Sequence, residues 1–143
     1  MAANLRNYAA YKAGLQGIPG LQLIAYDEAE RCNYQYIIGE VDEATAGISR
    51  DELVRVLHAE NVLARRYFYP GCHEMEPYRS RFPHAGLLLP ETNRLTQRVM
   101  SLPTGTAVGP KEIETVCAII RLAVENSQEL STRLAARQEG SRP

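Results

Sequence analysis

The stretch Cys32–Val41 reads CNYQYIIGEV, and it is the clearest strand signal in the chain. Aromatic and β-branched residues dominate it and no proline interrupts it, a composition typical of β-strands. Working outward, the charged residues 27–31 before it predict a turn, and the apolar run Leu21–Ala25 before them predicts a second strand. We therefore expect these two segments to belong to one small sheet.

Helical patterns flank the two strands. Asn4–Leu15 spaces its apolar residues along one helical face and runs into a segment rich in glycine and proline. Beyond the strands, Ser49 and Glu52 have the spacing of a capping box, in which each side chain bonds the other's backbone amide at a helix start. Pro110 opens the last predicted helix. Its apolar residues fall on one side: Ile113, Val116, Cys117, Ile120 and Val124.

Between these helices the chain alternates extended and irregular patterns. Residues 62–69 (VLARRYFY) predict another strand, and residues 70–90 carry four prolines and predict a long loop. A loop of that length inside a compact domain is usually functional or disordered, and its histidines and aromatic residues favour a functional one. Residues 90–100 predict a short helix that begins at a proline, and residues 101–103 a brief extended piece.

This order of elements predicts an α+β fold, in which two or three strands form a small antiparallel sheet covered on one side by helices. The 143 residues fit a single domain. We place that domain in residues 1–125 and predict a helical or frayed polar tail for residues 126–143.

Composition excludes several classes of function. A formal net charge of -1 argues against a protein that grips nucleic-acid backbones. No apolar stretch approaches the ~20 residues of a membrane span, and we see no secretory signal. The three cysteines are widely spaced without a CxxC pair, which favours a reducing cytoplasm. Cys72 and His73 lack two further ligands at zinc spacing, so we predict no metal site.

The segment Arg65–His73 (RRYFYPGCH), followed by Pro77–Arg79, is the main candidate for chemistry. Arginines fit phosphate in a bidentate way, and tyrosines with a histidine suit a hydroxyl-rich ligand. The alternative is that the arginines are solvated and the aromatic rings pack, which composition alone favours because such rings commonly fill cores. The loop Thr104–Pro110 is a weaker candidate for an anion site at a helix start, with a plain connection as the default.

Several motifs, in order, carry a resemblance to a known family. They are Asn7-Tyr8 and Tyr11, Asn33–Tyr36, Arg50–Leu53, Glu60–Val62, Arg66–His73 with Pro77-Tyr78, and Leu102–Thr106. Over about Asn4–Val124 the chain resembles the C-terminal domain of a DegT/StrS-type sugar aminotransferase. The resemblance implies the small domain of a fold-type-I enzyme that uses pyridoxal phosphate to move an amino group from an amino acid to a nucleotide-linked keto-sugar. Such enzymes are homodimers with active sites between subunits.

The resemblance also implies site residues. In the family, the small C-terminal domain closes one side of the active site and contacts the sugar nucleotide, which places Arg66, Tyr67, His73 and Tyr78 near that ligand. His73 would bond a sugar hydroxyl or a diphosphate oxygen, and Arg66 would pair with phosphate. Tyr67 has the alternative of simple packing. We assign no catalytic, cofactor-binding or metal-binding residue.

The lysine count limits what the chain can do alone. Pyridoxal phosphate chemistry needs a lysine amine, and the family's large N-terminal domain supplies both that lysine and the cofactor pocket. Lys12 and Lys111 are the only lysines, and neither lies in a segment that resembles the family's lysine motif. We therefore expect no cofactor on this chain and no transamination by it alone.

Two hypotheses remain open at this point. The chain is a piece of an aminotransferase, as a truncated gene product, a fragment or one half of a split enzyme, with a large-domain companion chain or a second copy as its possible partner. Alternatively, it is a free-standing module for sugar-nucleotide binding or dimerisation. The first predicts an exposed apolar docking face, for which Leu5, Tyr8 and Leu15 on the first helix are candidates.

Overall fold

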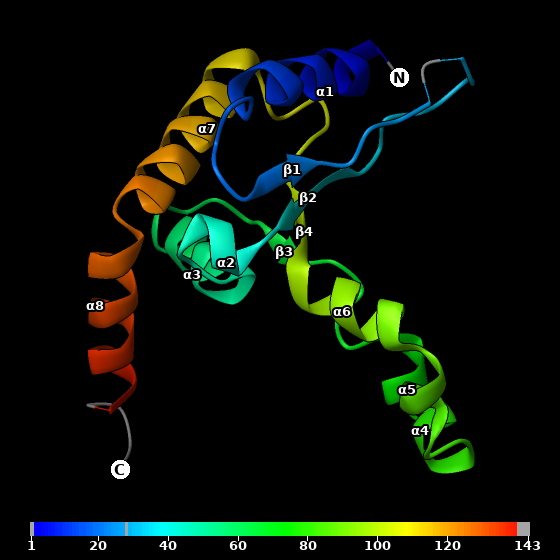
Figure 1. Cartoon of the computed structure of the whole chain (residues 1–143). Helices are drawn as coiled ribbons and strands as arrows, with labels where there is room; N and C mark the ends of the chain where they lie inside the picture. Colours follow the sequence, from blue (N-terminus) through cyan, green and yellow to red (C-terminus); the bar gives the residue numbers. More distant parts are fainter. Residues whose placement is uncertain (1, 28, 140–143) are drawn as a thin grey trace.

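A computed structural model of the chain describes residues 2–27 and 29–139, and it contains one four-stranded sheet (Figure 1). The strands are β1 (Leu21–Leu23), β2 (Ile37–Val41), β3 (Arg65–Arg66) and β4 (Val99–Leu102). Their order is β1-β2-β4-β3, and every neighbouring pair is antiparallel. The expected small antiparallel sheet is confirmed, with one strand more than predicted.

Helices make up most of the remainder, so the predicted α+β class is also confirmed. They are α1 (Ala2–Gly14), α2 (Glu43–Ala46), α3 (Arg50–Ala59), the 3-10 turn η1 (Cys72–Glu74), α4 (Tyr78–Arg81), α5 (Ala85–Leu88), α6 (Pro90–Arg98), α7 (Pro110–Glu125) and α8 (Ser127–Glu139). Within residues 2–27 and 29–139, none of these helices has the length and apolar character that crossing a bilayer requires.

The hydrophobic core lies where α1, α3 and α7 meet the sheet. Ile37 of β2, Leu53 of α3 and Ile120 of α7 are fully buried there, as the apolar periodicity of both helices predicts. The predicted capping box starts α3, because Ser49 Oγ accepts from the Glu52 amide and the Glu52 carboxylate accepts from the Ser49 amide.

Helix α1 packs closely along α7, and polar contacts hold its middle and its C-terminal end. Asn7 Nδ2 donates to the carbonyl oxygen of Gly105 at 3.0 Å, and Arg121 Nη2 donates to that of Gly14 at 3.1 Å. Tyr8 and Leu15 are only 3% exposed, so the expectation that they form an open docking face is wrong. Tyr8 lies on the face that α1 turns toward the core, and Leu15, directly after the helix, is buried in the same core.

Three predicted strands are shorter than expected, and the first, predicted over Leu21–Ala25, ends at Leu23. A strand is expected over residues 32–41, but β2 begins only at Ile37. Before it, Tyr34 has a positive φ of 52°, and its ring packs with Tyr8 and Tyr26. In place of a strand over residues 62–69, pairing is confined to two residues, and Phe68 has a φ of 44°. In the two latter cases, an aromatic segment with high strand propensity packs through its rings instead of joining the sheet.

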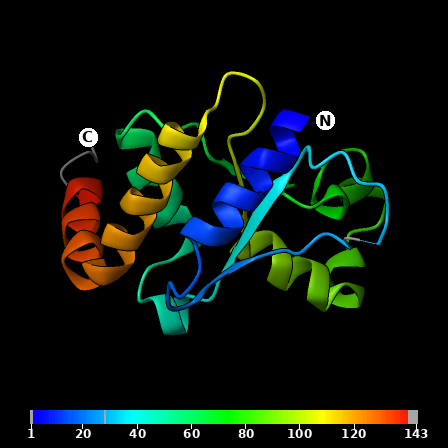
Figure 2. The ribbon, with the colours of Figure 1, turned by 90° about the horizontal axis from the view of Figure 1, so that it is seen from above.

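Residues 67–98, here called the arm, leave the sheet at the end of β3 and return at the start of β4. The predicted loop within them contains η1, α4 and α5, and α6 begins at Pro90 as expected. Figures 1 and 2 show the arm projecting on one side of the molecule and α8 on the other.

The predicted tail contains α8 over residues 127–139, and the frayed end expected at 140–143 lies outside the described residues. The division between a domain of residues 1–125 and a tail of residues 126–143 stays a prediction.

Candidate functional site

The arm contains an open hollow of about 500 Å³ that brings two of the four predicted site residues together. His73 of η1 and Tyr78 of α4 both line it. The other lining residues are Phe68, Gly71, Cys72, Phe82, Ala85, Leu89, Thr92 and Thr96. None of these residues carries a formal charge, so the hollow favours a neutral, partly apolar ligand group over a bare anion.

His73 has a fixed partner inside the arm. Its Nε2 lies 2.7 Å from Oδ1 of Asn93 on α6, and Asn93 Nδ2 donates to the Gly86 carbonyl oxygen at 2.9 Å. The three residues come from η1, α5 and α6, so this chain of hydrogen bonds ties the arm together. Motif reasoning missed Asn93, since a partner twenty residues away on another helix leaves no local pattern.

Arg66 lies apart from His73, in a second and more polar hollow of about 560 Å³ between α3 and α8. Its guanidinium is 4.5 Å from the centre of the Tyr69 ring, and its Nη1 is 3.9 Å from Asp51 Oδ2. The same Asp51 carboxylate bonds Arg50 Nε at 2.6 Å. Arg66 is therefore shared between an aromatic ring and a carboxylate, and it is half-exposed, which leaves its outer edge open to an anion.

Tyr67 stands on a third surface. Its ring centre is 5.4 Å from that of Tyr36 and 4.2 Å from that of Phe68. Burial raises the pKa of the Tyr67 phenol, with smaller contributions from Tyr36 and Tyr26. The phenol is thus a neutral hydrogen-bonding group. The ring packs against its aromatic neighbours, as the alternative interpretation expects, but Tyr67 stays half-buried.

The described residues do not fit pyridoxal phosphate. Lys12 and Lys111 are exposed, and neither lines the hollow in the arm, the one beside α3 or the groove between α1 and α7. A covalent aldehyde partner needs an amine that its surroundings activate. Because neither lysine lines any of these three hollows, we derive no chemical step through the cofactor.

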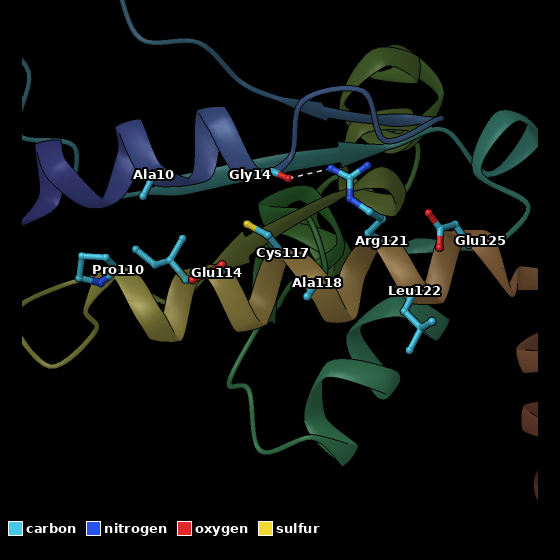
Figure 3. Close-up of a pocket in the computed structure, with 10 residues that line it drawn as sticks. Ala10, Gly14, Pro110, Glu114, Cys117, Ala118, Arg121, Leu122 and Glu125 are labelled. Carbon is cyan, nitrogen blue, oxygen red and sulfur yellow. Dashed lines mark hydrogen bonds between the residues drawn. The ribbon is translucent and has the colours of Figure 1, made fainter.

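The groove between α1 and α7 is the third hollow, with a volume of about 470 Å³ (Figure 3). Figure 3 shows Cys117 projecting from α7 toward α1 and Arg121 bonded across the groove to the Gly14 carbonyl. Burial raises the pKa of the Cys117 thiol to about 11, so the thiol is protonated and inert, as expected of a core cysteine. The groove contains none of the predicted site residues. Among residues 2–27 and 29–139, no cluster of side chains could hold a metal ion.

Comparison with known proteins assigns this arrangement of elements to a family. The sequence matches the DegT/DnrJ/EryC1/StrS aminotransferase family over residues 1–121, which is most of the chain. The chain belongs to this family. The family resemblance expected from the motifs is thereby confirmed, and the family's cofactor is pyridoxal phosphate.

Individual DegT/DnrJ/EryC1/StrS relatives include proteins of known structure. A crystal structure of DesI in the presence of its TDP-sugar product is 48% identical, with a TM-score of 0.85 over 94% of this chain and 33% of that one. The structure of S. venezuelae DesV with a ketimine intermediate is 24% identical, with a TM-score of 0.73 over 87% of this chain and 32% of that one, and it shows a shared fold.

A curated relative agrees with these structures. The dTDP-4-amino-4,6-dideoxy-D-glucose transaminase of Escherichia coli is 31% identical over 96 residues, which are 67% of this chain and 26% of the relative. The chain thus spans about a third or less of the length of these aminotransferases.

Proposed function

We propose that this chain supplies the small, nucleotide-sugar-contacting part of a pyridoxal-phosphate-dependent sugar aminotransferase, and that it does not transaminate alone. The observation that carries the proposal is the 48% identity to DesI, a protein crystallised in the presence of its TDP-sugar product, over 94% of this chain. The TDP-sugar of that relative supports a nucleotide-linked sugar as the ligand, and the resemblance to the family implies a keto-sugar that receives an amino group.

Residues of the arm and of β3 are the proposed contacts to the sugar nucleotide. His73 and Tyr78 face one uncharged hollow, which suits the sugar. Arg66 has an exposed guanidinium edge for phosphate, and Tyr67, the next residue in the sequence, offers a neutral phenol. Because these side chains lie on different surfaces, one ligand would contact them all only by extending from the hollow in the arm past β3 to the hollow beside α3.

Large exposed apolar side chains on the arm support a protein partner as well. Phe82 is 61% exposed and Leu87 and Leu88 are each more than 80% exposed, whereas such residues seldom gather on the surface of a protein that works alone. We propose that a large-domain companion chain, or a homodimer, covers this surface. The free thiols Cys32, Cys72 and Cys117 support a reducing, cytoplasmic setting.

Absorbance spectroscopy of the purified chain with pyridoxal phosphate tests the proposed inactivity. We expect only the spectrum of the free cofactor, the same as with a Lys12→Ala/Lys111→Ala double variant. A band near the visible edge that the double variant lacks would show a lysine-bound cofactor and overturn this part of the proposal.

NMR titration of the labelled chain with TDP-glucose tests the proposed ligand contacts, and size-exclusion chromatography tests the proposed partner. We expect chemical-shift changes in residues 66–78 and an association state that changes when the aminotransferase large domain is added. A monodisperse chain that binds the nucleotide sugar and ignores the large domain would instead identify a free-standing binding module.

A further inference from the structure

The hydrogen bonds of Asn93 determine which nitrogen of His73 carries its proton. A backbone carbonyl can only accept, so the Asn93 group 2.9 Å from the Gly86 oxygen must be the NH₂ group. The other end of the same amide, Oδ1, then faces His73 Nε2 at 2.7 Å. Because Oδ1 can also only accept, Nε2 must be the protonated nitrogen of a neutral His73.

The second nitrogen of the same ring is left as an open acceptor. Nδ1 has no hydrogen-bond partner in the part of the chain that the structure describes, and it is not sealed from its surroundings. The backbone of Gly71 lies against this edge of the ring, where an added Cβ would be 2.9 Å from Nδ1 and 2.7 Å from Cε1. His73 lines the hollow in the arm, and in its neutral form it offers one lone pair whose direction the fixed ring sets.

The chemistry of the hollow decides which ligand group fits that lone pair. An ionised phosphate oxygen has no proton to donate, and it would meet no arginine or lysine among the lining residues. A sugar hydroxyl donates a proton to nitrogen and leaves its carbon ring against Phe68, Tyr78 and Phe82. Of the two roles expected for His73, the structure therefore favours the hydroxyl contact over the diphosphate contact.

We propose that Asn93 is a positioning residue that holds neutral His73 with Nδ1 open, so that His73 accepts a hydrogen bond from a hexose hydroxyl of the bound nucleotide sugar. The hydroxyl contact rests on the proposed function. The orientation of His73 rests on the hydrogen bonds within the arm alone, so the two parts can fail separately.

The first experiment observes the imidazole directly, by ¹H–¹⁵N NMR of the labelled chain at about pH 8, where an ordinary histidine is neutral. The chain has only three histidines, so assignment is simple. We expect a His73 Nε2–H signal that exchanges slowly with water. Asn93→Leu should speed its exchange beyond detection, and Asn93→Asp, which keeps an acceptor, should retain it. Gln97→Leu, which removes an amide from the exposed side of the same helix, is the control and should leave the signal unchanged.

A pair of glycine substitutions tests whether the backbone of Gly71 fixes the position of the His73 ring. Gly71→Ala should displace His73 and abolish the slow signal, because its Cβ would overlap the ring and its φ of -60° allows alanine. Gly86→Ala should retain the signal, because its Cβ comes no closer than 3.6 Å to Asn93 Nδ2. A proton found on Nδ1, or a signal indifferent to both Asn93→Leu and Gly71→Ala, would overturn the positioning role.

The second experiment compares the affinities for TDP-glucose and for TDP. His73→Ala and Asn93→Leu should each weaken TDP-glucose binding about 3–10-fold, the value of one hydrogen bond, and leave TDP binding within about twofold. An equal loss for both ligands would overturn the hexose assignment. If neither ligand binds the unmodified chain, the proposed function fails and the hydroxyl contact with it, while the Nε2–H signal still decides the role of Asn93.

Discussion

The core and the arm of this molecule use similar residues in opposite ways. In the core, the apolar side chains of α1, α3 and α7 are buried against β2 and β4. In the arm, no residue of η1, α4, α5 or α6 is buried. The large exposed side chains there include Phe68, Met75, Tyr78, Phe82, Leu87 and Leu88.

The difference shows how the chain divides its tasks. Burial of apolar surface provides most of the free energy of folding, so stability must come from the core. The arm contributes little burial of its own and is held by polar contacts such as that between Asn93 and His73. It therefore keeps its apolar side chains available for a ligand and a partner.

The largest expected effect is on the core. Ile120→Ala, at a fully buried position of α7, should lower the free energy of unfolding by about 2–5 kcal/mol through lost burial and a cavity. Leu122 lies on the same helix but is 62% exposed, so Leu122→Ala is the matched control and should lower the free energy of unfolding far less. Denaturant unfolding measures both, and equal losses would contradict the assignment of α7 faces.

The contact between α1 and α7 is the next target. A Cβ on Gly14 would lie 2.6 Å from Cys117 Sγ, so Gly14→Ala should cost about 1–3 kcal/mol by overpacking. Adding Cys117→Ala removes that sulfur, and the double variant should lose less than the two single losses together. Strict additivity in thermal or denaturant unfolding would show that the helices separate at this point instead of pressing together.

The start of α3 provides a smaller, pH-dependent effect. Ser49→Ala should cost about 1 kcal/mol by removing the helix cap. Burial by itself would raise the pKa of the Glu52 carboxyl group, but hydrogen bonds from the Ser49 backbone and side chain outweigh burial, so the pKa is lowered. Because the folded pKa lies below the unfolded one, the carboxylate stabilises the fold above the ordinary glutamate range, and this contribution is lost as the pH falls through the lowered value.

Glu52→Gln isolates the charge at this cap. It should lower stability at neutral pH, and its difference from the unmodified chain should shrink as the solution is acidified. Unfolding curves at several pH values measure this difference. Glu125→Gln, at an exposed carboxylate of α7, is the control and should show no such trend. A Glu52→Gln loss that grows on acidification would contradict the assigned direction.

The smallest effect is expected on the arm. Leu87→Ser with Leu88→Ser should change the free energy of unfolding by no more than about 0.5 kcal/mol, because both side chains are more than 80% exposed. The same double change should weaken association with the large domain, measured by size-exclusion chromatography. A large loss of stability would show that the arm belongs to the core after all.

Sequence reasoning succeeded where local chemistry decides the structure. The Ser49–Glu52 cap and the apolar face of α7 follow from spacing alone, and both are confirmed. It overestimated the strand at Tyr34, because the ring packs on the distant Tyr8, and the strand at Phe68, where the backbone turns to a positive φ. Site prediction had a similar limit. The motif named His73 and Tyr78, but it could not show that Arg66 faces a different hollow or that Asn93 orients His73.

The bond from Arg121 to the end of α1 also has a consequence for synthesis on the ribosome. It joins residues 107 positions apart, so α1 emerges long before the helix that covers it. At about 5–20 residues per second, that delay is roughly 5–20 s. Throughout this interval the face of α1 that packs against α7 lacks its partner in the nascent chain, and chaperones that bind apolar segments would find it uncovered.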